Sequence, residues 1–174
     1  MKIDQGLIRE LPKDPVRTIR LLAALVRIGQ EFAPHTVIEG LQDASFVEVA
    51  RQLGARLGQG FALSRPMPAE DFLAWNHQQG PRASEPDAAL QTWPGALACL
   101  WMGSRDPQRA RRATQPDPCP LGRFLRAQAI TDSRVMGWYE EYRAADDAQR
   151  AERAAEELLQ WMAQRIVVDG AQPT

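Results

Sequence analysis

The segment VIEGLQ at residues 37–42 decides the fold of the first part of this chain. In it, a short run of β-branched residues ends in a carboxylate, Glu39, and a glycine follows at once. Two other segments share this form: KID at residues 2–4, and GQG at residues 58–60 after a second apolar run. Polar residues at the carboxyl ends of parallel strands converge at one mouth of an α/β barrel, so we expect the ends of these three segments to lie close together.

Strand-like and helical patterns alternate through residues 1–75. Short β-type runs stand at residues 1–3, 35–38 and 55–57. Helical patterns begin at the Pro15 segment, at a cap formed by Asp43 or Ser45, and after Pro68. The order strand, helix, strand, helix, strand is typical of a parallel sheet, so this part is predicted to be α/β.

The second part of the chain is predicted to be all helical. Residues 76–87 are rich in glycine, proline and polar residues and are interpreted as a linker. Residues 88–170 show helical spacing of apolar residues, interrupted by a polar, basic and proline-bearing loop at residues 105–118. The predicted organisation is therefore an α/β part at residues 1–75, a linker at 76–87 and a helical bundle at 88–170.

Composition narrows the function classes. The 174 residues carry 21 Lys and Arg against 22 Asp and Glu, which gives no field for non-specific binding of nucleic acid. No apolar run approaches the roughly 20 residues that span a bilayer, and a charged segment follows Met1 where a signal peptide would stand. The sequence thus predicts a cytoplasmic protein. Two cysteines, Cys99 and Cys119, do not make a disulfide framework.

The motifs resemble the C-terminal part of an EAL domain, the cyclic di-GMP phosphodiesterase module. KID at residues 2–4 with Leu7 and Ile8, IEGLQ at residues 38–42, and the run LGA…GQGF…RPM at residues 53–67 agree with that family in order and spacing. The resemblance implies a modified TIM barrel, of which residues 1–75 would supply about three parallel strands. It covers about the last third of such a domain.

The resemblance also implies a chemistry. Cyclic di-GMP is the implied ligand, and two divalent metals, Mg²⁺ or Mn²⁺, activate the water that attacks one of its phosphodiester bonds. Lys2 matches the lysine that positions this water, Glu39 matches a carboxylate of the metal shell, and Gln59 matches a glutamine near the attacking water. A hard cation prefers carboxylate oxygens, and a lysine suits a phosphate as a point charge.

Two departures from the family pattern bear on activity. The family's other metal ligands precede its lysine strand, so we expect them to lie ahead of Met1 in a longer parent protein. This chain alone is therefore expected not to hydrolyse cyclic di-GMP. Gln42 replaces the second glutamate of the family's loop, which keeps hydrogen bonding but removes the charge that links dimerisation to metal binding.

The helical part resembles a CZB-type domain, a zinc-binding helical bundle. The similarity rests on CPLGRFL at residues 119–125. That family binds zinc through three histidines and one cysteine, whereas His35 and His77 both precede this segment. Two thiols do not close a tetrahedral zinc site, so the expected structure is a degenerate bundle without zinc.

Two alternative functions stay open at this point. The chain could be a non-enzymatic regulatory or dimerisation module, because an incomplete barrel exposes strand edges and interior apolar surface. It would then pair with itself or with the missing half of the barrel. A weaker alternative is a redox or metal sensor that uses Cys99 and Cys119. Taken singly, Lys2 is typical of a solvated terminal lysine and Gln59 of a turn, so their assigned roles depend on the motifs.

Overall fold

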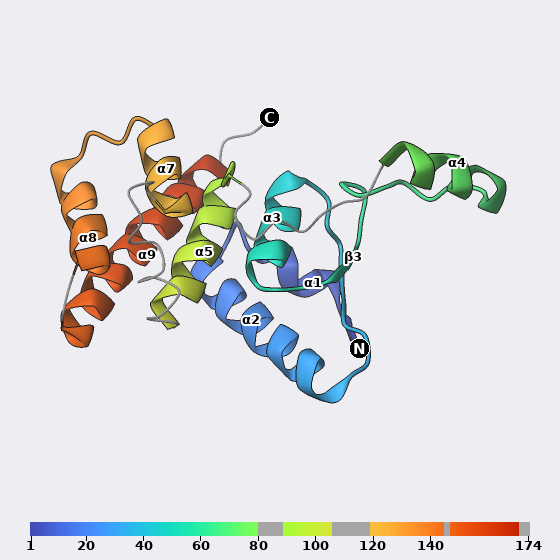
Figure 1. Ribbon diagram of the computed structural model, residues 1–174, viewed down its shortest axis with the longest axis horizontal. Helices are drawn as coiled ribbons and strands as arrows, with labels where there is room; N and C mark the ends of the chain where they lie inside the picture. The colour runs from blue at the N-terminus through green and yellow to red at the C-terminus, as the bar shows by residue number, and fades with distance from the viewer. Residues whose placement is uncertain (80–88, 106–118, 145–146, 171–174) are drawn as a thin grey trace.

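The computed structural model describes residues 1–79, 89–105, 119–144 and 147–170 (Figure 1). Over these residues the protein is mostly helical, with a small three-stranded parallel sheet near the N-terminus. The order of elements confirms the predicted sequence of an α/β part followed by helices.

The sheet consists of β1 (Lys2–Ile3), β2 (Val37–Glu39) and β3 (Leu57–Gln59), in that spatial order and all parallel. The strands β2 and β3 each begin two residues later than the sequence predicted. The amide of Ala55 still donates to the carbonyl of Ala50 (3.0 Å), so this residue completes a helical turn before β3 starts. β2 starts where the amide of Val37 donates to the carbonyl of Met1 (2.9 Å), its first bond to the β1 segment.

Four helices belong to this first part: α1 (Gln5–Ile8), α2 (Pro15–Phe32), α3 (Ala44–Gln52) and α4 (Ala69–Gln79). Asp14 caps α2 by accepting from the amide of Arg17 (3.2 Å), and Pro15 stands at the first helical position. Asp43 caps α3 by accepting from the amides of Ser45 (2.8 Å) and Phe46 (3.2 Å). Of the two predicted caps for this helix, the structure therefore uses the aspartate.

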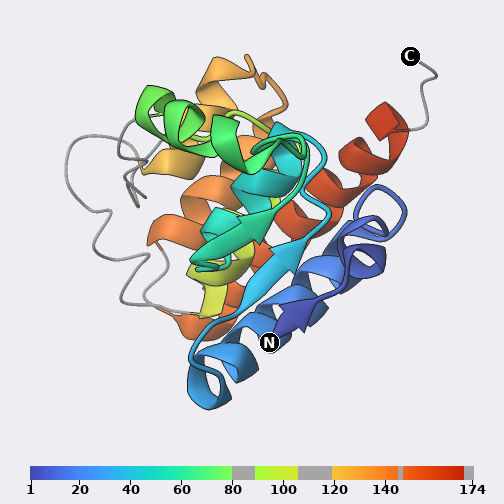
Figure 2. The same ribbon diagram turned by 90° about the vertical axis from the view of Figure 1, so that its right-hand side faces the viewer.

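The helices cover one face of the sheet. Ile3 and Ile38 are paired in register and buried, and α2 and α3 lie behind the strands in the view of Figure 2. Because side chains alternate along a strand, Lys2, Val37 and Glu39 point from the opposite face, where each is exposed or half-buried. None of the described helices covers this second face, which distinguishes the sheet from the parallel sheets of complete α/β proteins, covered on both sides.

The second part contains α5 (Trp93–Arg105), α7 (Pro120–Ala127), α8 (Ser133–Ala144) and α9 (Ala148–Gly170). These bounds confirm the helical character predicted for residues 88–170. The predicted basic loop, with Arg109, Arg111 and Arg112, lies outside the described residues apart from Arg105, which ends α5. Helix α9 packs against α8, α5 and α2, and α3 packs against α5.

The hydrophobic core is continuous between the two parts. One cluster of buried residues includes Ile38 of the sheet, Val49 of α3, Leu97 of α5 and Leu158 of α9. Helix α4 extends to Gln79, so residues 76–79 of the predicted linker are helical, and residues 80–87 lie outside the described part. The division of the chain at residues 76–87 stays a prediction.

Within the described ranges, no helix is long and apolar enough to cross a membrane.

Candidate functional site

The three predicted site residues lie on the uncovered face of the sheet. Strand pairing places Lys2 opposite Val37 and Glu39 opposite Gln59. Because the side-chain period of a strand is two, Lys2, Glu39 and Gln59 all project from the face opposite Ile38. The common face therefore follows from register alone.

Lys2 and Glu39 are in direct contact. The ammonium Nζ of Lys2 forms an ion pair with Oε1 of Glu39, and the two side chains are 69% and 25% exposed. The more buried partner is thus the carboxylate, which lies at the carboxyl end of the central strand. Gln59 is exposed and neighbours Glu39 through the β2–β3 backbone pairing.

The loops after β2 and β3 fix the positions of Glu39 and Gln59. The amide of Leu41 donates to the carbonyl of Gln59 (3.1 Å), and the amide of Ala62 donates to the carbonyl of Leu41 (3.0 Å). Gly40 turns the chain with a φ of +76°, a conformation that favours glycine. The two strand ends are therefore joined by backbone hydrogen bonds, which hold the carboxylate beside the amide side chain.

The donor types at this site fit a hard divalent cation. Glu39 offers carboxylate oxygens and Gln59 an amide oxygen, and Mg²⁺ binds through one or two carboxylates together with substrate phosphates and water. The number of donors is small, since the described residues contain no group of three or more His, Cys, Asp or Glu side chains that could hold a metal. A cation at Glu39 would also compete with the Lys2 ammonium for the same oxygen.

Cys119 takes part in a contact within the helical part. It occupies the N-cap position of α7, and its Sγ lies 2.9 Å from the Tyr139 hydroxyl. Burial and then the hydrogen bond with Cys119 raise the pKa of Tyr139 above its usual value, while Arg143 opposes the shift. The metal or redox role of Cys119 stays a prediction.

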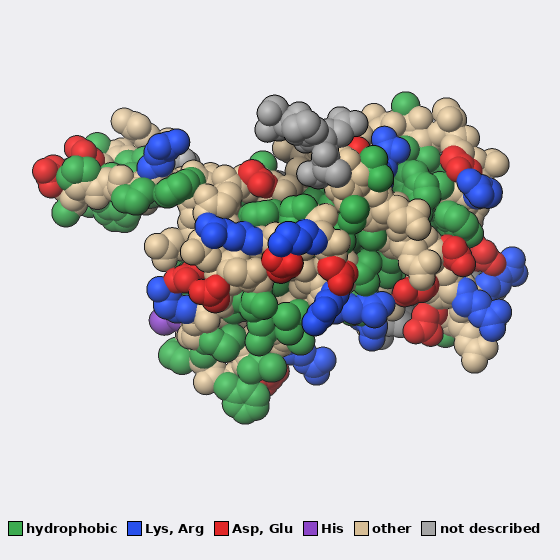
Figure 3. All heavy atoms as spheres, turned by 180° about the vertical axis from the view of Figure 1, so that it is seen from behind, with side chains coloured by type: hydrophobic (Ala, Val, Ile, Leu, Met, Phe, Trp, Pro, Cys, Tyr) green, Lys and Arg blue, Asp and Glu red, His purple; other side chains and the backbone are tan. Residues whose placement is uncertain are grey.

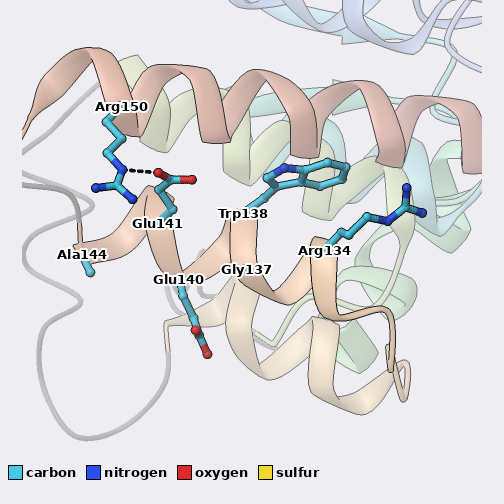
Figure 4. A pocket seen from close by; sticks show the side chains of 7 residues that line it. All are labelled: Arg134, Gly137, Trp138, Glu140, Glu141, Ala144 and Arg150. Carbon is cyan, nitrogen blue, oxygen red and sulfur yellow. Dashed lines mark hydrogen bonds and ion pairs between the residues drawn. The ribbon is translucent and has the colours of Figure 1, made fainter.

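A groove lies on the helical part, away from the sheet. It has a volume of about 600 Å³ and lies between α8 and α9, as Figure 4 shows. Its lining includes Trp138, Arg134 and the ion pair between Glu141 and Arg150. None of the predicted site residues lines this groove. The spacing of apolar residues in the sequence gives no signal for this groove.

Sequence comparison finds partial similarity to cyclic di-GMP signalling proteins. The chain is 39% identical over 74 residues to the bifunctional diguanylate cyclase/cyclic di-GMP phosphodiesterase MucR of Pseudomonas aeruginosa. It is 33% identical over 75 residues to the oxygen sensor protein DosP of Escherichia coli and 29% identical over 75 residues to its probable cyclic di-GMP phosphodiesterase PdeN.

These matches are short relative to both partners. They cover 42%, 43% and 43% of this chain and 11%, 9% and 14% of the three relatives. The chain therefore matches only about a tenth of the length of these curated relatives. No protein-family model matches the chain, and no solved structure matches it.

Proposed function

We propose that this chain is part of an EAL-type, cyclic di-GMP-specific phosphodiesterase. In this proposal its α/β part is the C-terminal portion of a (β/α) barrel, and cyclic di-GMP is the ligand. Two of the partial relatives carry cyclic di-GMP phosphodiesterase in their names. The matched length of 72 to 75 residues is also that of the predicted α/β part, residues 1–75.

The observation that carries the proposal is the arrangement of Lys2, Glu39 and Gln59. The three side chains share one face of a parallel sheet, with Glu39 and Gln59 at the carboxyl ends of β2 and β3 and Lys2 at the first position of β1, where its ammonium contacts Glu39. In a (β/α) barrel the uncovered face would be the interior and this end would be the mouth where active sites lie. A fragment of such a barrel would carry helices on only one face of its sheet.

Each residue has a role that suits its chemistry. Glu39 would hold a Mg²⁺ or Mn²⁺ ion, which supplies an activated water when it is bound. Lys2 would orient that water and offset phosphate charge, and the contact of its ammonium with the Glu39 carboxylate supports this role. Gln59, one strand further along the same face, would donate to or accept from the water.

The same donor set predicts that the 174-residue chain is inactive by itself. One carboxylate does not fix two cations, so the remaining ligands must come from a further segment.

The test joins the chain to a relative. The full chain replaces the matched 74-residue segment of MucR, and hydrolysis of cyclic di-GMP is measured with Mn²⁺. We expect the chimera to hydrolyse cyclic di-GMP and the isolated chain to show no turnover.

The variant Glu39→Gln removes the charge from the metal-facing carboxylate and should abolish turnover in the chimera. The matched control is Glu10→Gln, which changes an exposed carboxylate that pairs only locally with Lys13. A folded but inactive chimera would contradict the assignment of the α/β part. Turnover by the isolated chain that disappears in Glu39→Gln would contradict its predicted inactivity.

A second candidate function is a non-enzymatic interaction module of cyclic di-GMP signalling. The observation in its favour is exposed apolar surface: Phe32, Phe61, Phe72 and Leu73 are all more than 48% exposed. Two of these residues lie on α4, which projects from the body of the molecule in Figure 1. Binding of cyclic di-GMP by the isolated chain without hydrolysis, measured by calorimetry, would favour this candidate.

A further inference from the structure

Gln5 stands just past the end of β1, where α1 begins. Asp4 caps this short helix by accepting from the amide of Gly6 (2.7 Å), which fixes the backbone on both sides of Gln5. Glu39 and Gln59 are the last residues of the two other strands. Each of the three strands therefore has a carboxylate or amide side chain at or just past its carboxyl end.

Gln5 lies against the loop that follows Glu39. Gly40 comes directly after Glu39 and is buried. A Cβ atom at Gly40 would clash with the Cβ of Gln5, and it would lie 3.0 Å from the Cα and 3.6 Å from the Oε1 of the same residue. Both the stem and the amide head of Gln5 are thus packed beside the residue next to the site carboxylate.

The amide head of Gln5 is available to a ligand. Gln5 is exposed, and within the described ranges its side chain takes part in no hydrogen bond. Neighbouring strands lie about 4.8 Å apart, so Gln5, Glu39 and Gln59 form a row roughly 10 Å wide with the carboxylate in the middle. Figure 3 shows α4, which follows β3, standing clear of the body of the molecule. Because Gln59 is exposed as well, a ligand bound beside Glu39 can reach both amides.

We propose that Gln5 is a substrate-binding residue, which donates from Nε2 to a non-bridging oxygen of the phosphodiester group bound beside Glu39. The inference rests on the proposed phosphodiesterase function and adds a further residue to its site. A phosphodiester oxygen is an anionic acceptor, and hydrogen bonds to such acceptors are stronger than those between neutral groups. The amide of Gln5 differs from the Lys2 ammonium because it adds a directed donor without adding charge.

Substitution can separate the packing of Gln5 from its hydrogen bonding. Gln5→Met keeps an unbranched side chain of similar length against Gly40 but has no donor. Gln5→Arg restores N–H donors at the same place. A residue that only packs on Gly40 would tolerate the loss of its donor, whereas a substrate-binding residue would not.

The test uses the chimera in which the full chain replaces the matched segment of MucR. Hydrolysis of cyclic di-GMP with Mn²⁺ gives KM and kcat, and calorimetry in metal-free buffer gives the Kd for cyclic di-GMP without turnover. Gln5→Met should raise KM and Kd about tenfold and change kcat less than about twofold, since it removes one hydrogen bond to an anionic group. Gln5→Arg should bring both constants back to within about threefold of the parent chimera. The control Gln160→Met, at an exposed glutamine on α9, should change neither constant.

Two outcomes would overturn the role of Gln5. One is a Gln5→Met chimera whose KM and Kd stay at the parent values, and the other is an equal loss of affinity in Gln5→Met and Gln5→Arg, which would mark a structural contact. A chimera that binds cyclic di-GMP through Gln5 but does not hydrolyse it would contradict the phosphodiesterase assignment and leave the binding role of Gln5 standing. A chimera that neither binds nor hydrolyses cyclic di-GMP would contradict both proposals.

Discussion

At the scale of single residues, Gly60 shows how closely the two site loops approach. A Cβ atom at this position would lie against the backbone N, C and O atoms of Leu41. Backbone atoms cannot rotate away as a flexible side chain can, so the loop after β2 and the loop after β3 would have to separate. The amide of Leu41 also donates to the carbonyl of Gln59 (3.1 Å), which joins the same two loops.

The variant Gly60→Ala should therefore destabilise the protein by about 1–3 kcal/mol, as overpacking does in other tightly packed sites. Its matched control is Gly137→Ala on α8, where an added Cβ meets nothing within 4 Å. The control should stabilise the protein by about 0.5–1 kcal/mol, because alanine favours a helix over glycine. Urea denaturation of both variants measures the difference, and shifts of the same sign would contradict this account of the loops.

Tyr139 makes the stability of the helical part sensitive to high pH. Its pKa is raised mainly by burial and also by the hydrogen bond with Cys119, so folding favours the neutral phenol. A tyrosine whose pKa is raised by folding contributes a stabilisation that is fully present below its pKa in the unfolded chain, about 10. This stabilisation is lost as the pH rises through its pKa in the folded protein. We expect urea midpoints to fall between pH 9 and 11.5, and to fall less in Tyr139→Phe. The control Tyr142→Phe should keep the wild-type slope, and identical slopes in all three proteins would be inconsistent with this cause.

At the scale of elements, Glu48 joins the α/β part to the helical part. From α3, its carboxylate accepts hydrogen bonds from the amides of Gln91 (2.8 Å) and Thr92 (2.9 Å), just ahead of α5. It thereby satisfies amides next to the start of a helix whose dipole favours a negative charge. Gly95 leaves the space for this carboxylate, since a Cβ atom there would meet the Glu48 side chain.

The variant Glu48→Gln cannot accept from both amides, because one end of its side chain is a donor. We expect a loss of about 1–3 kcal/mol in the free energy of unfolding and faster hydrogen exchange in the first turn of α5. Glu157→Gln, an exposed carboxylate on α9, is the control and should change stability by less than about 0.5 kcal/mol. Equal effects of the two substitutions would show that the hydrogen bonds from Gln91 and Thr92 to Glu48 contribute nothing to stability.

The sequence predicted local features of these elements better than distant ones. Asp43 and Pro15 mark helix starts through chemistry that acts within a few residues, and the structure uses both. The starts of β2 and β3 were misplaced by two residues because pairing between strands, which no local pattern records, sets them. The cap from Glu48 to α5 spans more than forty residues and left no signal in spacing.

At the scale of the whole molecule, the sequence named the candidate site residues but did not predict how the helices pack around them. The family resemblance named Lys2, Glu39 and Gln59 as site residues, whereas their common face is set by the strand register and the two-residue period, and no local pattern records that register. The packing of α9 against α2 could not be predicted, because an amphipathic helix specifies that a face is buried but not what buries it. A continuous core was therefore unforeseen.

That core predicts that the α/β part and the helical part unfold together. Leu97 of α5 is fully buried within the cluster that also holds Ile38 and Leu158. Leu97→Ala should cost about 2–5 kcal/mol, as cavity formation does in other cores. If the parts form one cooperative unit, hydrogen exchange at the amides of Ile38 and Leu158 should accelerate by the same factor. Leu73→Ala, at a position that is 66% exposed, should leave both rates unchanged. Acceleration at Leu158 alone would instead show two independent units, with their boundary near the predicted division at residues 76–87.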